Sequence, residues 1–158
     1  MKTAKLKIIE QSDKVGLYSI CFDGNDLTEY EKFVQKFLND ATLNKDFQKV
    51  FRAINRIVAN GALERYFRPE GRYKDHVAAL SIDSKVLRIY CLRISDQILI
   101  ARNGGAKTTR TYEEDVELSG YVMDLQKFDE LLAQELTSGK ITIEQNVITG
   151  IESATFEL

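Results

Sequence analysis

The stretch VLRIYCLRISDQILIARNGGAKTTR, residues 86–110, decides the fold of this chain. Its first two parts, residues 86–94 and 97–103, are rich in the branched apolar side chains that β-strands favour. Only Ser95 and Asp96 separate them, and so short a link joins antiparallel neighbours. The stretch therefore predicts a β-hairpin that ends in a glycine-containing, cationic segment.

Alternation along the first of these strands gives its two faces different characters. Leu87, Ile89 and Cys91 share one face, whereas Arg88 and Tyr90 share the other. The arginine is thus predicted to lie on the opposite face from Leu87, Ile89 and Cys91.

Regular elements are predicted on both sides of the hairpin. A polar turn over residues 11–14 separates two N-terminal strands, and two blocks of apolar residues at helical spacing follow. Asp26 with Glu29 resembles a capping box that opens the first helix, and Asn60-Gly61 supplies the stop of the second. The expected strands are 6–9, 15–22, 77–82, 86–94, 97–103, 140–144 and 147–151, and the expected helices run from Asp26 to Leu38, from Leu43 to Asn60 and from Glu114 to Leu136.

These elements predict an α+β fold in which N-terminal strands and two helices pack on an antiparallel sheet, with a long C-terminal helix and a short terminal hairpin. The 158 residues fit one domain, of which residues 139–158 form a C-terminal extension. The composition, with 44% hydrophobic and 29% charged residues, is that of a folded protein. The aromatic residues of the helices are therefore predicted to be core rather than a platform for stacked bases.

Charge is distributed unevenly along the chain. Residues 64–112 carry 10 Lys and Arg against 5 Asp and Glu, whereas residues 113–158 carry 2 against 11. The whole chain has a formal net charge of −2. A locally basic segment can attract a polyanion although the protein is acidic overall, and the other interpretation is a mixed, solvated surface.

Residues that would support metal or thiol chemistry are sparse. Cys21 and Cys91 lie far apart in apolar strand patterns, so both are predicted to be buried free thiols. His76 is the single histidine and cannot by itself build a zinc site, so we expect no metal and no cofactor. No segment approaches the roughly 20 apolar residues of a membrane span, and no secretory signal is recognisable, which predicts a cytoplasmic protein without membrane contact.

Glycines and cations gather where the hairpin ends. Asn103-Gly104-Gly105 is predicted to be a tight turn, and Lys107 and Arg110 follow it closely. Backbone amides and cations at strand ends can hold a phosphate, which favours RNA as a ligand. The alternative is that exposed strands carry Lys and Arg for solubility.

The order of elements and several motifs resemble the RelE/HigB-like toxins of bacterial toxin–antitoxin systems. Leu87-Arg88-Ile89-Tyr90 is similar to that family's third-strand Leu-Arg-aromatic motif. Gly105-Ala106-Lys107-Thr108 resembles the Lys-Lys-Thr turn after its fourth strand, with Ala106 in place of the first Lys. The likeness is strongest over residues 86–109 and extends more loosely over 15–135.

The resemblance implies a RelE-like fold and a ribosome-dependent endoribonuclease that cuts messenger RNA in the decoding site. In that chemistry an RNA 2′-hydroxyl attacks the adjacent phosphate, and the enzyme supplies a base, an acid and a cation for the developing charge. The motifs map onto Arg88 as a phosphate-binding guanidinium, Lys107 as a balancing cation, and Tyr112 as a group that stacks on a base or transfers a proton. The implied partners are a cognate antitoxin and messenger RNA on the ribosome.

Other cations are assigned to RNA binding only as a group. The strand 77–82 carries no basic residue where the family has them, so no general base is identifiable unless a residue at the start of this strand reaches the site. The predicted phosphate-attracting rim consists of Arg72, Lys74, His76, Arg93, Arg102 and Arg110.

Three functions stay open from the sequence. The first is the toxin ribonuclease, and the second is a non-catalytic module of the same fold that binds RNA, the ribosome or a regulatory protein. The third is a protein-interaction domain whose basic segment meets an acidic protein. Binding that hardly changes with salt would count against both RNA functions, because neutralising phosphates releases counterions.

Overall fold

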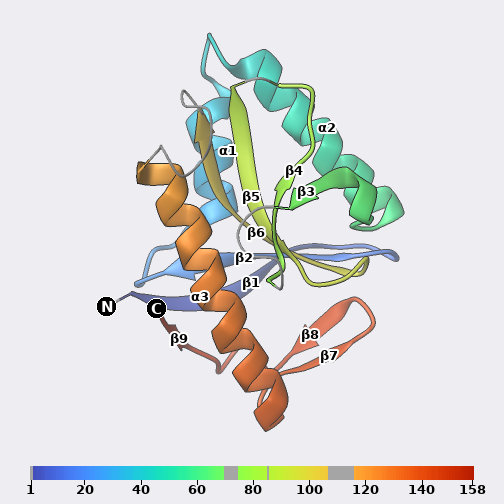
Figure 1. The fold of residues 1–158 in the computed structure, drawn as a ribbon, viewed down its shortest axis with the longest axis vertical. Coiled ribbons are helices and arrows are strands. Elements are labelled where there is room, and N and C mark those ends of the chain that lie inside the picture. Colours follow the sequence, from blue (N-terminus) through green and yellow to red (C-terminus); the bar gives the residue numbers. More distant parts are fainter. Residues whose placement is uncertain (1, 70–74, 85, 107–115) are drawn as a thin grey trace.

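The computed structural model describes residues 2–69, 75–84, 86–106 and 116–158, in which helices lie on both faces of one large sheet (Figure 1). Its strands are β1 (Thr3–Gln11), β2 (Gly16–Phe22), β3 (Phe67–Pro69), β4 (Val77–Leu80), β5 (Leu87–Arg93), β6 (Ile98–Ala106) and β9 (Phe156–Glu157), in the order β3-β4-β5-β6-β2-β1-β9. A separate hairpin pairs β7 (Thr142–Glu144) with β8 (Val147–Thr149). The helices are α1 (Glu29–Leu38), α2 (Asn44–Asn60) and α3 (Val116–Ser138), with a 3-10 turn, η1, over Glu64–Tyr66.

Over the described residues, the large sheet is mixed. β2 and β6 run parallel, with Gly16 opposite Ile98 and Ser19 opposite Ala101, and the other strand pairs are antiparallel. The expectation of an antiparallel sheet is therefore wrong for this one pair. Two helices and three strands separate β2 from β6 in the chain, so no short link reveals the direction of their pairing.

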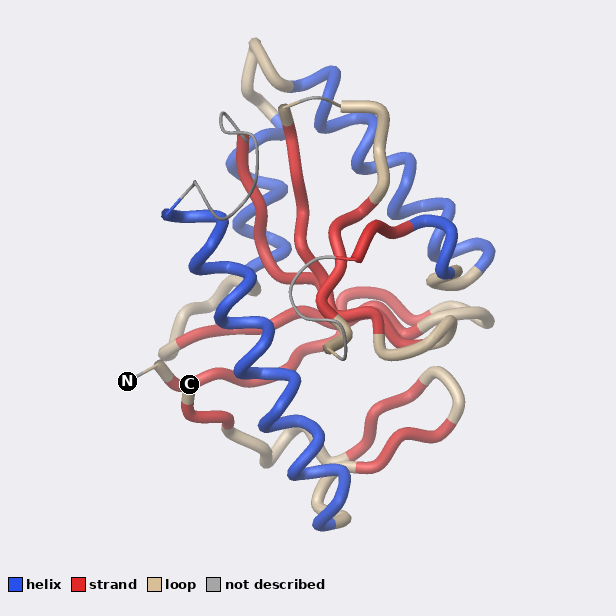
Figure 2. The backbone as a smooth tube through the Cα atoms, in the orientation of Figure 1, coloured by secondary structure: helices blue, strands red, loops and turns tan. Residues whose placement is uncertain are grey.

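Helices α1 and α2 cover one face of the sheet (Figure 2). Phe33 of α1 and Phe47 of α2 are buried in one cluster with Ile89 of β5. Burying an apolar side chain of this size stabilises the folded state by about 1.5–3 kcal/mol relative to leaving it exposed. The apolar stripes predicted for both helices are confirmed, although Leu38 and Phe51 at their margins stay exposed.

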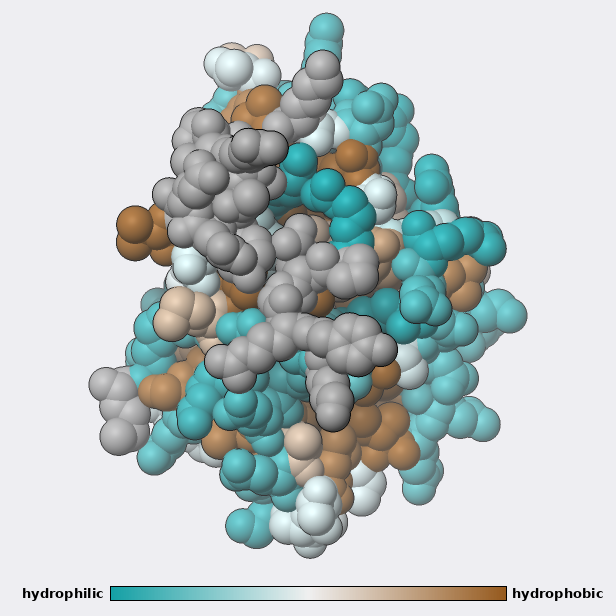
Figure 3. All heavy atoms as spheres, viewed as in Figure 1, coloured by the Kyte–Doolittle hydropathy of each residue, from teal (hydrophilic) through white to brown (hydrophobic). Residues whose placement is uncertain are grey.

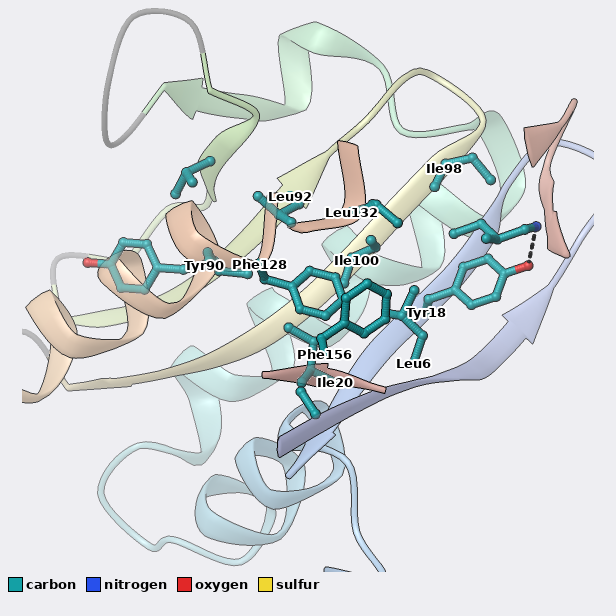
Figure 4. Packing of buried hydrophobic residues seen from close by; sticks show 14 of the residues in the cluster. Leu6, Tyr18, Ile20, Tyr90, Leu92, Ile98, Ile100, Phe128, Leu132 and Phe156 are labelled. Atoms are coloured by element: carbon teal, nitrogen blue, oxygen red, sulfur yellow. Dashed lines mark hydrogen bonds between the residues drawn. The ribbon is translucent and has the colours of Figure 1, made fainter. Parts of the chain in front are cut away.

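Helix α3 covers the opposite face together with the C-terminal residues. The rings of Phe128 in α3 and Phe156 in β9 lie 4.6 Å apart between centroids (Figure 4). The Ile148 amide donates to the Tyr18 hydroxyl at 2.9 Å, which ties β8 to the sheet (Figure 4). The extension 139–158 thus adds strand β9 to the sheet and closes the core beside α3.

Gly104 lies inside β6 and not in the turn that the sequence predicts. β6 continues through Ala106, and Gly104 pairs with Ile89 of β5. A Cβ at Gly104 would lie 1.8 Å from the Arg88 carbonyl oxygen, a distance that no side chain tolerates. The glycine is therefore required for the close approach of β5 and β6 rather than for a turn.

The N-terminus of α1 differs from its predicted position by two residues. Thr28 is the N-cap in place of Asp26, because its hydroxyl accepts from the Glu31 amide at 3.2 Å while Glu31 accepts from the Thr28 amide at 2.9 Å. The pairs 26/29 and 28/31 have the same spacing, so the pattern alone does not separate them. Glu29 is instead buried and contacts Arg102.

Several other expectations are confirmed. Helix α2 ends at Asn60, and Gly61 follows at a φ of 99°. The long C-terminal helix and the terminal hairpin are both present, and Cys21 and Cys91 are buried free thiols. Burial raises the pKa of the Cys91 thiol to about 12. Strands β3 and β9 were not predicted, since strands of three and two residues are too short to show alternation.

Among the coloured residues in Figure 3, hydrophilic and hydrophobic areas alternate over the face, with hydrophilic side chains prominent along its margins. Within the part of the chain that the structure describes, no helix combines the length and apolar character needed to cross a membrane. The large apolar side chains that stay exposed there are Ile8, Leu38, Phe51, Val86, Val116, Met123 and Val147.

Candidate functional site

Arg88 lies near the start of β5, on the strand that the sequence singled out. Its Nη1 donates to the Ser84 carbonyl at 2.7 Å and to the Leu87 carbonyl at 3.0 Å. The Ser84 hydroxyl in turn accepts from the Leu87 amide at 2.9 Å, which fixes the loop before the strand. The guanidinium is therefore half-buried and folded back on its own loop.

Arg88 pairs across the sheet with Gly105, the penultimate residue of β6. A Cβ at Gly105 would lie 3.8 Å from Lys36 Nζ of α1, and this lysine forms an ion pair with Glu117 of α3 at 3.4 Å. We call Arg88, Gly105 and Lys36 the β5–β6 end. It brings two cationic side chains, from a strand and a helix, to the C-terminal end of β6.

Arg102 occupies the interior and not the cationic rim that the sequence predicts. Its side chain is 4% exposed, and its guanidinium donates to Glu29 and, at 2.7 Å, to Asp124 of α3. The Phe22 and Tyr121 rings both lie 4.7 Å from Arg102 Cζ, within reach of a cation–π contact. With its charge matched by two carboxylates, Arg102 is structural and does not belong to an exposed cationic rim.

The ion pairs of Arg102 extend to the surface through its two carboxylates. Lys2 pairs with Asp124 at 2.9 Å, and Lys32 pairs with Glu29 at 3.1 Å. Burial lowers the pKa of Arg102, while the hydrogen bond to Asp124 opposes that change. The result is a charged cluster that connects α1, β6 and α3 beside the β5–β6 end.

Arg93 has a structural position at the other end of β5. Its Nε donates to the Ala62 carbonyl at 2.8 Å, and its guanidinium pairs with Asp96 in the β5–β6 turn. These bonds attach Ala62, two residues after the end of α2, to the sheet. Arg93 thus joins the helical layer to the hairpin, and its remaining exposure, 21% of the side chain, is small for a phosphate contact.

His76 forms a dyad with Asp129 of α3. The His76 Nδ1 lies 2.9 Å from Asp129 Oδ1, and the His76 amide donates to Asp129 Oδ2 at 3.1 Å. The hydrogen bond to Asp129 raises the pKa of His76, although partial burial opposes the shift. Nearly half of the His76 side chain is exposed, so an imidazole with an oriented ring faces solvent at the start of β4.

The structure does not bring this dyad to the β5–β6 end. The Arg93 amide donates to the His76 carbonyl at 2.9 Å, so His76 lies opposite Arg93. Arg88 and Arg93 are five positions apart on β5, which at about 3.3 Å per residue separates the backbones of Arg88 and His76 by about 16 Å. A single phosphate therefore cannot contact the side chains of Arg88 and His76 at once where they lie in the structure.

Five of the predicted site residues lie outside the described residues: Arg72, Lys74, Lys107, Arg110 and Tyr112. Among the residues that are described, no three His, Cys, Asp or Glu side chains are grouped as metal ligands. Comparisons with protein-family models, with curated proteins and with solved structures found no match to this chain.

Sequence reasoning missed the acidic and aromatic partners of Arg102. Glu117, Tyr121 and Asp124 follow one another at helical spacing. Tyr121 and Asp124 contact Arg102, while Glu117 accepts from the Tyr121 hydroxyl and pairs with Lys36. That polar stripe, next to the apolar stripe of α3, was a readable signal. The pairing of this stripe with Arg102 on β6 could not be predicted from local sequence, because 22 positions separate Arg102 from Asp124 and 73 separate it from Glu29.

Proposed function

We propose that the protein is the toxin component of a toxin–antitoxin system and cuts messenger RNA on the ribosome. The observation that carries the proposal is the pairing of Arg88 with Gly105. It sets the arginine beside the end of β6, and Lys107 follows Gly105 by two positions in the chain. Lys36 supplies a further cation at the same end. The cognate antitoxin would be the partner that blocks this end.

In the proposed reaction Arg88 holds the phosphate that the RNA 2′-hydroxyl attacks. Its guanidinium would exchange the carbonyls of Ser84 and Leu87 for phosphate oxygens. A guanidinium binds a phosphate through two parallel hydrogen bonds and an ionic attraction that neutral carbonyls do not offer, which favours the exchange. Lys107 would balance the charge that develops on the phosphate, and Tyr112 would stack on a base or transfer a proton.

The position of His76 favours a second function, in which the protein binds RNA, the ribosome or a regulatory protein without cutting. The single histidine of the chain lies about 16 Å from Arg88 along the sheet. It is therefore not placed as the base for a phosphate at the β5–β6 end. Cleavage would then depend on Tyr112 for proton transfer.

Induced expression tests the two functions against each other. We would follow growth and map messenger RNA 5′ ends on ribosomes for the wild type, Arg88→Ala, Lys107→Ala and the control Lys14→Ala. Lys14 precedes β2 at the opposite end of the sheet, where Gly16 pairs with Ile98. We expect growth arrest with new in-frame cuts in the wild type and in Lys14→Ala. Arg88→Ala and Lys107→Ala should each abolish the arrest and the cuts without loss of folding.

No arrest and no cuts from a folded wild-type protein would reject the ribonuclease. Ribosome binding that weakens with salt would then support the non-catalytic function, because phosphate contacts release counterions.

A further inference from the structure

The outer edge of β1 is covered over only two of its residues. β9 pairs with Thr3 and Ala4, and no other strand of the described chain lies on that side of β1. The chain turns before it reaches β9, with the Ala154 amide donating to the Ile151 carbonyl at 3.2 Å. The edge beyond Ala4 is therefore open in line with β9.

The hydrogen bonds at the start of β1 identify the peptide groups that face this edge. The Lys2 carbonyl accepts from the Leu158 amide on the β9 side, whereas the Thr3 carbonyl accepts from the Asp23 amide on the β2 side. Because these directions alternate along a strand, the peptide groups of Leu6 and Ile8 face the open edge. Those groups are strong donors and acceptors that a further strand can use.

There is room beside the edge for such a strand. A groove of about 490 Å³ is lined by the four consecutive residues 5–8 of β1, together with Ile151 and Glu152. A second groove, of about 510 Å³, continues along residues 7–10 toward α1 and α2 and includes the exposed ring of Phe51. A β-bulge between Ile8 and Glu10 interrupts the regular strand, so the straight open edge spans residues 5–8.

The side chains at the edge specify the chemistry of the added strand. Leu6 belongs to the core cluster on the α3 side, and Ile8, two positions on, is 47% exposed on the same side. Lys5 and Lys7 project to the other side, where they line a groove together with Cys21. β9 already follows this division, because Phe156 is buried opposite Ala4 and Glu157 is exposed opposite Thr3.

We propose that residues 5–8 of β1 bind an extended segment of a partner protein as an added β-strand, and that this segment alternates apolar and acidic side chains. Main-chain hydrogen bonds to Leu6 and Ile8 provide the affinity. Apolar side chains of the segment cover Ile8, and acidic side chains lie opposite Lys5 and Lys7. The site is independent of the RNA function proposed above.

A second copy of the chain fits the edge less well. Two β1 strands paired through this edge would place lysines of one copy near lysines of the other, and like charges directly opposite are unfavourable. The proposal therefore commits to a different, acidic chain.

The test uses a fluorescent octapeptide of alternating valine and glutamate with the full-length protein. Backbone amide exchange followed by NMR is the first readout. The amides of Leu6 and Ile8 should exchange at least 10-fold more slowly with peptide, whereas those of Lys5 and Lys7, already paired with β2, should not change. No slowing at Leu6 and Ile8 with saturating peptide would overturn the proposal.

Binding by variants is the second readout, measured by fluorescence anisotropy. Ile8→Pro removes one outward amide, and Lys5→Glu with Lys7→Glu reverses the charge; each should weaken binding at least 10-fold. Lys14→Glu, an exposed lysine of the β1–β2 turn, should leave binding unchanged. Thermal unfolding checks that each variant is folded. If Ile8→Pro does not fold, the charge-reversal variant alone tests whether residues 5–8 bind the acidic peptide. Equal binding of a valine–lysine peptide, or the same amide protection by an RNA oligonucleotide, would contradict the proposal.

Discussion

Arg102 and Asp124 form an ion pair at 2.7 Å between the sheet and the helix that covers it. Glu29 of α1 contacts the same guanidinium from another element, so one buried cation connects three parts of the fold. Removing one member of such a group leaves charge without a partner in a medium that solvates it poorly. The stability of the fold should therefore depend on the group as a unit.

Arg102→Met tests this dependence. We expect a loss of about 3–5 kcal/mol in the free energy of unfolding, because Glu29 is left buried without its main cationic partner. Urea-induced unfolding followed by circular dichroism gives the value. Adding Glu29→Gln to Arg102→Met should recover part of the loss, since the uncompensated carboxylate is then neutral.

An exposed pair provides the matched control for Arg102. Lys49 and Asp83 lie 4.0 Å apart at the surface, so Lys49→Ala should change stability by less than about 1 kcal/mol. If Arg102→Met cost no more than Lys49→Ala, the buried group would not hold the layers together.

Arg102 also shows where reasoning from the sequence stopped. Alternation from Ile98 and Ile100 puts Arg102 on the α3 face, and both isoleucines are buried there. The pattern thus contained the burial of Arg102, but its position beside the predicted turn Asn103-Gly104-Gly105 led to its assignment to the phosphate-attracting rim. Its two carboxylate partners come from helices far away in the chain, and local patterns carry no information about them.

Local signals were sufficient elsewhere in the fold. The β5–β6 hairpin, helix α3 and the β7–β8 hairpin each follow from periodicity and short links, and each is present. The parallel pairing of β2 with β6 and the short strand β9 depend on contacts between distant segments. These long-range contacts are the part of the architecture that the sequence did not reveal.

The N-cap of α1 is a local feature for which two assignments can be compared directly. Thr28→Ala should lower the free energy of unfolding by about 1 kcal/mol, because the Glu31 amide loses its acceptor. Asp26→Ala, at the position that the sequence favoured, should stay within about 0.5 kcal/mol of the wild type. Parallel urea titrations of the two variants provide the measurement, and the reverse order would restore Asp26 as the cap.

The His76–Asp129 dyad should make stability depend on pH. Because the hydrogen bond to Asp129 raises the folded-state pKa of His76 above 6.5, the dyad stabilises the fold fully below the unfolded-state pKa. The contribution is lost as pH rises through the folded-state pKa. Because nearly half of the His76 side chain is exposed, we expect a contribution of less than about 1 kcal/mol.

The single histidine makes the dyad easy to follow by NMR. Titration of its ring protons should give a pKa that falls in Asp129→Asn, and the pH dependence of urea unfolding should shrink in the same variant. An unchanged histidine pKa in Asp129→Asn would show that the dyad does not form in solution.

Substitution by alanine should have opposite effects on stability at two glycines, Gly104 and Gly120. Gly104→Ala should destabilise the protein by about 3 kcal/mol or more, because its Cβ would lie 1.8 Å from the Arg88 carbonyl oxygen and push β5 away from β6. Gly120→Ala, inside α3 with nothing within 4 Å of its Cβ, should stabilise the protein by up to about 1 kcal/mol, because alanine favours the helix. Thermal and urea unfolding of both variants would decide the matter, and tolerance of alanine at 104 would mean that β5 and β6 are not in the close contact on which the position of Arg88 depends.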